Sequence, residues 1–416
     1  MNTFSVLFLA ALIIATGVRQ WLALRHVRHI MAHRNTVPPA FSQEIGVEAH
    51  QKAAEYSSAK TRLNMASIAF DAAVLLILTF GGGLQAIDDL AASYFPDGIG
   101  HGVLFVGILV VIMSVIEMPF GLYRTFGIES RFGFNKMTLG MYLGDLVKHA
   151  VVGALFGLPL LFAVLWLMAG MGEYWWLYVW VVWVVFNTLV LAIYPTFIAP
   201  LFNKFSPMQE GEMKKRIEGL ITRCGFTSKG LFVMDGSKRS SHGNAYFTGF
   251  GKSKRIVFFD TLLSRLEIPE IEAVLAHELG HFRMRHVIKR MAWTFAVSLG
   301  FLFLLGVLKD QAWFYEGLHV GFPATDAMAL VLFFMVVPVF TFLLQPLMAM
   351  YSRKHEFEAD QYAAKFAPAG DLVHALVKLY KDNASTLTPD PLHSAFYDSH
   401  PPASIRIARL EQLAKA

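Results

Sequence analysis

Long apolar segments alternate with polar connections along most of this chain. A helix that crosses a lipid bilayer needs about 20 predominantly apolar residues, and seven stretches fit that length. They lie at residues 4–24, 63–84, 103–123, 147–169, 175–199, 291–308 and 327–350. The pattern therefore predicts a mainly α-helical, polytopic membrane protein with about seven transmembrane helices.

Two long polar regions lie outside these spans, and we expect the chemistry of the protein there. Two spans separate them, so both would lie on one side of the membrane and form one split domain. Strand-like runs at 231–234, 245–248 and 255–259 predict a small β-sheet in the first region. The predicted organisation is helices 1–5 over 1–200, the first polar segment over 201–290, helices 6–7 over 291–350, and the second polar segment over 351–416.

The positions of Lys and Arg predict the orientation. Arg25, Arg28 and Arg34 follow the first span, and no positive side chain precedes it. This arrangement is typical of an uncleaved anchor with its N-terminus outside. The loop after the third span is basic, whereas the loops after the second and sixth spans are not. Alternation through seven spans then places both polar regions on the cytoplasmic side.

The composition agrees with a membrane protein and narrows the possible chemistry. Hydrophobic residues make up 55% of the 416 positions and charged residues only 16%, which is more apolar than a soluble domain. Cys224 is the only cysteine, so a disulfide framework and a Cys-rich zinc site are excluded. We attribute the net charge of +5 to cytoplasmic loops, and we predict no nucleic-acid partner.

The first polar region contains the motif H-E-L-G-H, from His277 to His281, on a helix predicted to start near Pro269. A spacing of four residues places both imidazoles on one helix face, where they can bind one zinc ion. Glu278 lies beside that position, as a general base would. The plainer interpretation is two surface histidines on an amphipathic helix. Because no Gly or Pro interrupts residues 282–298, we expect this helix to continue into the sixth span.

Two histidines leave zinc one protein ligand short, and the second polar region supplies candidates. Glu356 and Asp360 are four residues apart and share a helix face, whereas Glu358 is turned away from Glu356. One of the two carboxylates can bind the metal while the other holds a ligand histidine through its second ring nitrogen. Considered alone, the run 352–360 would be a solvated acidic helix.

Together these motifs resemble the integral-membrane CAAX prenyl endopeptidases, which are zinc proteases of the gluzincin type. The resemblance extends over most of the chain. It also rests on R-F-G-F-N-K at 131–136, Y-P-T-F-I-A-P-L-F-N-K-F at 194–205, S-H-G-N-A-Y-F-T-G at 241–249, and H-P-P at 400–402 followed by Arg406.

The resemblance implies a role for each matching residue. One zinc ion would be bound by His277, His281 and Glu356, and Glu278 would be the catalytic base. Asp360 would support a ligand histidine, Asn244 would bind the substrate backbone, His400 would stabilise the oxyanion, and Arg406 would lie behind the site. The strand that follows Asn244 could also bind an extended substrate along its edge.

The implied activity is hydrolysis of a peptide bond near the C-terminus of isoprenylated C-a-a-X peptides by zinc-activated water. The expected partners are a peptide or prenylated peptide and the lipid bilayer. The tail at 410–416 carries no retention signal of the endoplasmic reticulum. We therefore expect a bacterial member in the inner membrane, whose native substrate could differ.

Three other classes of protein are alternatives to this family. A heat-shock-type membrane endopeptidase would have about four spans, and a site-two-type protease would place its motif inside an apolar span. A transporter or lipid-binding protein with a residual zinc helix would not cleave peptides. Four polar residues at membrane depth fit either the water-filled chamber of the family or hydrogen bonds between helices; they are Asp71, Glu117, Asn187 and Gln345.

Overall fold

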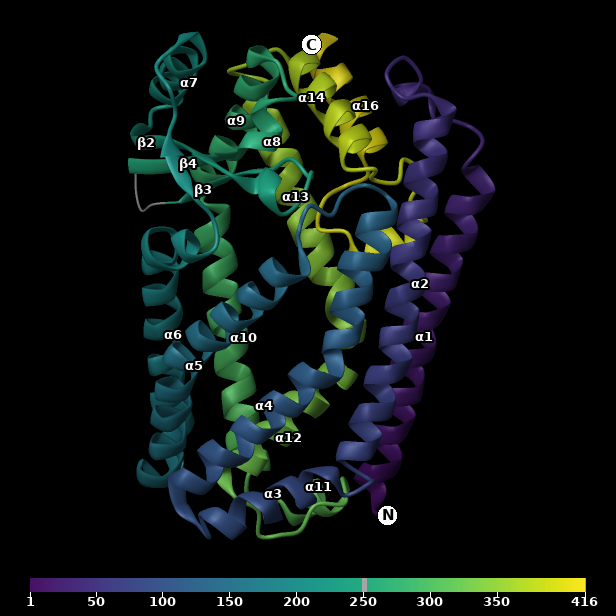
Figure 1. The fold of residues 1–416 in the computed structure, drawn as a ribbon. Helices are drawn as coiled ribbons and strands as arrows, with labels where there is room; N and C mark the ends of the chain where they lie inside the picture. The colour runs from purple at the N-terminus through teal and green to yellow at the C-terminus, as the bar shows by residue number, and fades with distance from the viewer. Residues whose placement is uncertain (249–252, 416) are drawn as a thin grey trace.

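The computed structural model describes residues 1–248 and 253–415 of the chain. The molecule is elongated, with long helices along its length and a sheet with short helices at one end (Figure 1). The N-terminus lies at the opposite end from the C-terminus, which belongs to the sheet-bearing end. The two polar regions of the sequence therefore meet at one end of a helical body.

Seven helical segments in the described part of the chain are long and apolar enough to cross a membrane, which confirms the predicted polytopic α-helical fold. Their helices are α1 (Thr3–His33), α2 (Val47–Leu78), α4 (Gly98–Leu122), α5 (Leu139–Gly170), α6 (Trp175–Ile193), α10 (His286–Leu308), and α12 (Asp326–Thr341) followed by α13 (Gln345–Ala363).

The shorter helices occupy the two ends of this body. They are α3 (Gly83–Tyr94), α7 (Glu212–Arg223), α8 (Asp260–Leu263), α9 (Ile268–Arg283), α11 (Ala312–Glu316), α14 (Ala369–Asp382), α15 (Pro391–Tyr397) and α16 (Ala403–Lys415). Helix α3 lies in the non-basic loop after the second span, where we expected only a connection. A run of three glycines, from Gly81 to Gly83, separates it from α2, which therefore ends at Leu78.

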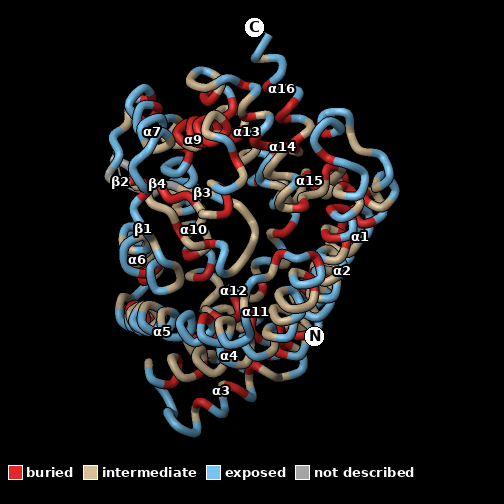
Figure 2. Tube along the Cα trace, turned by 45° about the horizontal axis from the view of Figure 1, so that its top comes forward, coloured by how far each residue is buried: buried red, intermediate tan, exposed pale blue. Residues whose placement is uncertain are grey.

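The outer faces of the spanning helices are apolar. Val111 on α4, Leu155 on α5 and Val185 on α6 are 63%, 66% and 60% exposed in the isolated chain. Figure 2 shows exposed residues along these outer helices and a concentration of buried residues on α9. Large apolar surfaces of this kind are stable in lipid rather than in water.

A four-stranded sheet forms in the first polar region, in the order β1-β2-β4-β3. Strands β2 (Thr227–Met234) and β4 (Ser253–Phe259) are parallel, and the edge strands β1 (Phe205–Pro207) and β3 (Ala245–Thr248) are antiparallel to their neighbours. The sequence did not predict β1, because a three-residue edge strand that ends in proline has no alternating pattern.

The two polar regions share one hydrophobic core, which confirms the predicted split domain with its small sheet. Leu275 on α9 is fully buried in the cluster that also contains Ile256 of β4, Leu376 of α14 and Leu410 of α16. Residues more than a hundred positions apart are therefore held in one unit. The exact residue bounds of the four predicted segments stay a prediction.

The predicted continuation of the H-E-L-G-H helix into the sixth span is wrong. Helix α9 ends at Arg283, and α10 begins at His286. Between them Arg285 adopts the left-handed conformation, with φ of 57°. A non-glycine residue rarely adopts this conformation. Because the sequence has no Gly or Pro at this point, it gave no indication that the helix breaks here.

The polar residues at membrane depth form no hydrogen bond between helices within the described residues. Asp71 accepts a hydrogen bond from Ser67, and Asn187 donates one to Trp183, both on their own helices. Asp71, Glu117 and Gln345 are exposed in the isolated chain. Of the two interpretations, interhelical hydrogen bonding therefore receives no support.

Gly280 allows α9 and α13 to approach closely. A Cβ atom at this position would lie 3.1 Å from Ala359 Cα and 3.2 Å from the Ala359 carbonyl oxygen. These are backbone atoms of α13, so they cannot rotate away. The absence of a side chain at residue 280 therefore sets the separation between the two helices.

We predict that Gly280→Ala destabilises the protein by about 1–3 kcal/mol, because the added methyl group overpacks the α9–α13 contact. Thermal unfolding in detergent should show a midpoint several degrees lower. Gly219→Ala on α7 is the matched control, since nothing lies within 4 Å of its Cβ position. A Gly280→Ala midpoint equal to that of the control would contradict this account of the packing.

Candidate metal centre

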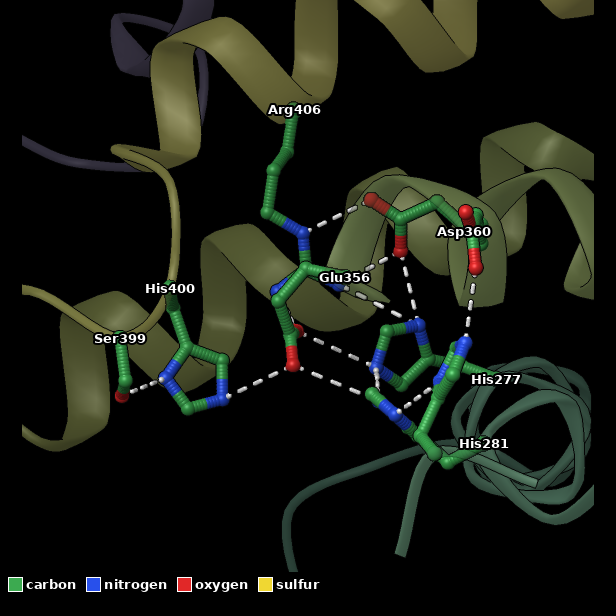
Figure 3. Close-up of polar contacts among 9 residues, drawn as sticks. His277, His281, Glu356, Asp360, Ser399, His400 and Arg406 are labelled. Atoms are coloured by element: carbon green, nitrogen blue, oxygen red, sulfur yellow. Dashed lines mark hydrogen bonds and ion pairs between the residues drawn. The ribbon is translucent and has the colours of Figure 1, made fainter. Parts of the chain in front are cut away.

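Helices α9 and α13 bring three potential metal ligands together. His277 and His281 lie one turn apart on α9, and their Nε2 atoms are 3.3 Å apart. Glu356 on α13 faces both of them: Oε2 lies 3.5 Å from His277 Nε2, and Oε1 lies 3.3 Å from His281 Nε2 (Figure 3). The ligand atoms of the three residues all lie within 4.8 Å of one another.

These distances fit a tetrahedral zinc ion. With ligands about 2.0–2.1 Å from zinc, neighbouring ligand atoms in a tetrahedron are about 3.3–3.4 Å apart. Glu356 Oε2 is also buried without a hydrogen-bond partner among the described residues, and a buried polar atom of this kind calls for a ligand or ion. Two imidazoles and one carboxylate form a donor set that zinc prefers in catalytic sites.

Asp360 orients His277 from behind. His277 Nδ1 lies 2.8 Å from Asp360 Oδ1, and an ionised carboxylate can only accept hydrogen bonds. The Nδ1 atom of His277 must therefore carry the proton, which leaves the lone pair of Nε2 directed at the metal position.

Arg406 holds Asp360 in turn. It donates two hydrogen bonds to Asp360, from Nε at 2.9 Å and from Nη2 at 2.6 Å. Its Nη1 lies 3.6 Å from Glu356 Oε2. Burial lowers the pKa of Arg406, but the hydrogen bonds to Asp360 outweigh burial and raise that pKa. The guanidinium therefore stays charged between two buried carboxylates.

The electrostatic field at His277 favours a cation. Burial lowers the pKa of His277, but its contacts with Asp360 and Glu356 outweigh burial and raise the pKa to about 9. A field that stabilises a proton on this imidazole also stabilises a metal cation beside it, and the two compete for the same nitrogen.

His400 lies at the open side of the cluster. Its Nε2 is 3.5 Å from Glu356 Oε1, and its side chain is 63% exposed. Ser399 Oγ lies 3.0 Å from His400 Nδ1. Arg353 on α13 supports this segment, because its guanidinium donates hydrogen bonds to the carbonyl groups of Ser394, Ala395 and Asp398.

Two predicted site residues are not joined to the cluster. Glu278 is half-buried on α9, and its carboxylate has no hydrogen-bond or ion-pair partner among the described residues. Asn244 is exposed immediately before β3, and its Oδ1 accepts a hydrogen bond from the amide of Ala245. The structure therefore leaves both side chains available to a water molecule or a substrate.

The residues that hold the segment before Asn244 were not predicted from the sequence. His242 lies 3.5 Å from Glu129 and 3.2 Å from Asn383, and its ring stacks on Phe134. Tyr56 donates a hydrogen bond to the same Glu129. These partners are distant in the sequence, so only the fold reveals them. His242 is not a member of the cluster formed by His277, His281 and Glu356.

The fold and the site together define an integral-membrane metallopeptidase. Residues 26–204 match the family model for the CAAX prenyl protease N-terminal region with five membrane helices, and residues 207–414 match the model for peptidase family M48. The chain belongs to peptidase family M48 and has the N-terminal membrane region of its CAAX prenyl proteases.

Individual relatives cover nearly the whole chain. CAAX prenyl protease 1 of Saccharomyces cerevisiae is 33% identical over 91% of this chain and 89% of its own length. The Homo sapiens CAAX prenyl protease 1 homolog is 31% identical over 98% and 96%. The crystal structure of S. mikatae Ste24p superposes with a TM-score of 0.92, at 31% identity, and covers 99% of this chain and 100% of that one.

We predict that Asp360→Asn lowers the zinc affinity by about 10–100-fold, because the amide no longer fixes the proton on His277 Nδ1. The affinity is measured by competition with a chromophoric chelator. Asp310→Asn is the control, because Asp310 is exposed in the connection after α10. An Asp360→Asn protein that binds zinc as tightly as the control would show that Asp360 does not orient the ligand.

Proposed function

We propose that this chain is a zinc endopeptidase that hydrolyses a peptide bond near the C-terminus of isoprenylated C-a-a-X peptides. The observation that carries the proposal is the cluster of His277, His281 and Glu356, whose spacing fits one tetrahedral zinc ion. The names of the relatives supply the substrate class. One zinc ion, a prenylated peptide and the bilayer are the proposed cofactor and partners.

A bound zinc ion would polarise the scissile carbonyl and lower the pKa of a water molecule. Glu278 accepts the proton of that water on a carboxylate oxygen and then delivers it to the leaving amine. The geometry supports this role, because Glu278 adjoins His277 on α9 and its carboxylate makes no competing contact within the described residues. A carboxylate held by an ion pair would be a weaker base.

His400 donates a hydrogen bond to the developing oxyanion. With the Ser399 hydroxyl donating a hydrogen bond to Nδ1, the proton of His400 lies on Nε2, which is 3.5 Å from Glu356 Oε1. This tautomer presents an N–H donor beside the metal position, where negative charge would develop on the substrate oxygen.

Strand β3 positions the substrate. It pairs with β4 and is the last strand in the described sheet order, so its other edge is available to an extended peptide. Asn244, immediately before this strand, hydrogen-bonds the backbone of the bound peptide. A peptide that lies along β3 in this way is held in register for cleavage.

The proposed orientation has the zinc domain in the cytoplasm, because basic loops alternate with non-basic loops through the seven spans. The bacterial inner membrane stays a prediction from the sequence, and the relatives named above are eukaryotic.

Replacement of Glu278 by Gln should lower kcat for a farnesylated C-a-a-X peptide by roughly 10²–10⁴-fold and leave the zinc content unchanged. Glu316→Gln, at an exposed position in the connection between α10 and α12, is the matched control and should cleave normally. The unprenylated peptide is measured in parallel and should be a poor substrate.

Each alternative outcome has a definite meaning. Normal cleavage by Glu278→Gln would refute the role of this residue as the base. Equal cleavage of the two peptides would retain the endopeptidase but reject prenyl recognition. No cleavage by zinc-loaded protein would support a non-proteolytic membrane protein.

Removal of the metal should abolish cleavage and lower the thermal unfolding midpoint, since the proposed ion joins α9 to α13. Zinc at 100 times its dissociation constant stabilises the folded state by about 2.7 kcal/mol. Addition of one equivalent of zinc to chelator-treated protein should restore both activity and midpoint. Full activity in the continued presence of a strong chelator would contradict the proposal.

A further inference from the structure

A second group of ionisable side chains lies directly behind His281. His286, the first residue of α10, is completely buried, and its Nε2 lies 2.8 Å from Glu358 Oε2. Its Nδ1 lies 3.0 Å from His281 Nδ1. The ring of His355 stacks on the ring of His286, with centroids 3.9 Å apart. The proposed chemistry uses none of these three residues.

The Glu358 carboxylate determines which nitrogen atoms in this group donate hydrogen bonds and which accept them. The carboxylate of Glu358 can only accept, so His286 donates from Nε2. A neutral His286 then has a bare Nδ1, which can only accept a hydrogen bond. His281 must therefore carry its proton on Nδ1, and the lone pair of its Nε2 is left facing Glu356 and His277.

The result is the same as at the other ligand histidine, where Asp360 contacts His277 Nδ1 directly. At His281 no carboxylate oxygen lies behind Nδ1 within the contacts of the described residues, and His286 transmits the effect of Glu358 instead. A carboxylate thus keeps the proton away from the metal-facing Nε2 of each imidazole. Asp360 does so by direct contact with His277, whereas Glu358 acts on His281 through His286.

The break between α9 and α10 makes this contact possible. In a continuous helix, residues five apart point about 140° away from each other, so His281 and His286 would occupy different faces. The left-handed conformation of Arg285 turns the chain, and the two rings come together with centroids 5.1 Å apart. A strained, non-glycine connection that brings two imidazoles into hydrogen-bond contact is consistent with a functional constraint.

We propose that His286 and Glu358 are positioning residues that fix the tautomer and orientation of His281 as a zinc ligand, an inference that rests on the proposed zinc site. Loss of an outer-shell partner of a metal ligand typically weakens metal binding by 10–100-fold. Glu358 acts only through His286, and this dependence distinguishes the pair from two independent structural contacts.

A second metal ion is the competing interpretation, because ligand atoms of His286, His355 and Glu358 also lie within 4.8 Å of one another. The stacking of the two rings argues against it. Their planes differ by only 9°, and the lone pair of each ring nitrogen lies in the plane of its own ring. An ion about 2 Å from a nitrogen of each ring would lie far outside both ring planes.

The experiment compares the zinc affinity of full-length protein in detergent for His286→Phe, Glu358→Ala and the double variant, by chelator competition. The absorption spectrum of the cobalt-substituted protein reports the ligand geometry. We expect His286→Phe to weaken zinc binding by about 10–100-fold, with a smaller loss for Glu358→Ala. The double variant should bind no more weakly than His286→Phe alone, and the single variants should alter the cobalt spectrum.

His355→Phe is the matched control, because it keeps an aromatic ring in the stack and does not contact His281. It should bind zinc as the unmodified protein does. Unchanged affinity in His286→Phe and Glu358→Ala would overturn the inference, as would additive losses in the double variant. Two zinc ions in the unmodified protein and one in Glu358→Ala would establish the second metal site instead.

The proposed zinc site and the positioning role of His286 and Glu358 can be refuted separately. An unmodified protein that binds no zinc would refute the proposed function itself. If His286→Phe does not fold, Glu358→Ala decides alone, because the Glu358 side chain is 31% exposed and its removal leaves the core intact. In that case, an affinity equal to that of His355→Phe would overturn the inference.

Discussion

The site depends on the close contact between α9 and α13 at Gly280. Helix α9 supplies both histidines of the cluster and α13 supplies Glu356 and Asp360, so the separation of the two helices sets the distances from Glu356 to both histidines. Backbone atoms of Ala359 lie against residue 280 and leave no space for a side chain. The same contact joins two polar regions that are separated in the sequence by two membrane spans. The packing of α9 against α13 therefore brings the three proposed ligand residues within reach of one ion.

Acceptor-only carboxylates then determine the protonation pattern of the site. Asp360 acts on His277, and Glu358 acts through His286 on His281. In both cases, a carboxylate fixes which ring nitrogen carries the proton. The two proposed ligand histidines thereby present lone pairs to the ion, whereas His400 presents an N–H donor. One physical rule thus prepares both ligand histidines for metal binding.

Much of the fold could be predicted from the sequence, because the strongest signals are local. Seven apolar stretches of sufficient length predict seven spans, and the four-residue spacing of His277 and His281 places both on one helix face. Features that depend on tertiary contacts could not be predicted. Arg285 adopts a conformation that its residue type disfavours, so the break before α10 gave no signal. The roles of His286 and Arg353 likewise arise only after distant segments are packed together.

The most direct test of the central claim is to locate the metal by anomalous X-ray scattering at the zinc edge, in crystals of zinc-loaded protein. The account predicts one zinc ion, bound by Nε2 of His277, Nε2 of His281 and the carboxylate of Glu356, at about 2.0–2.2 Å from each. An ion between His286 and Glu358, or zinc-loaded crystals in which His277, His281 and Glu356 bind no ion, would contradict it.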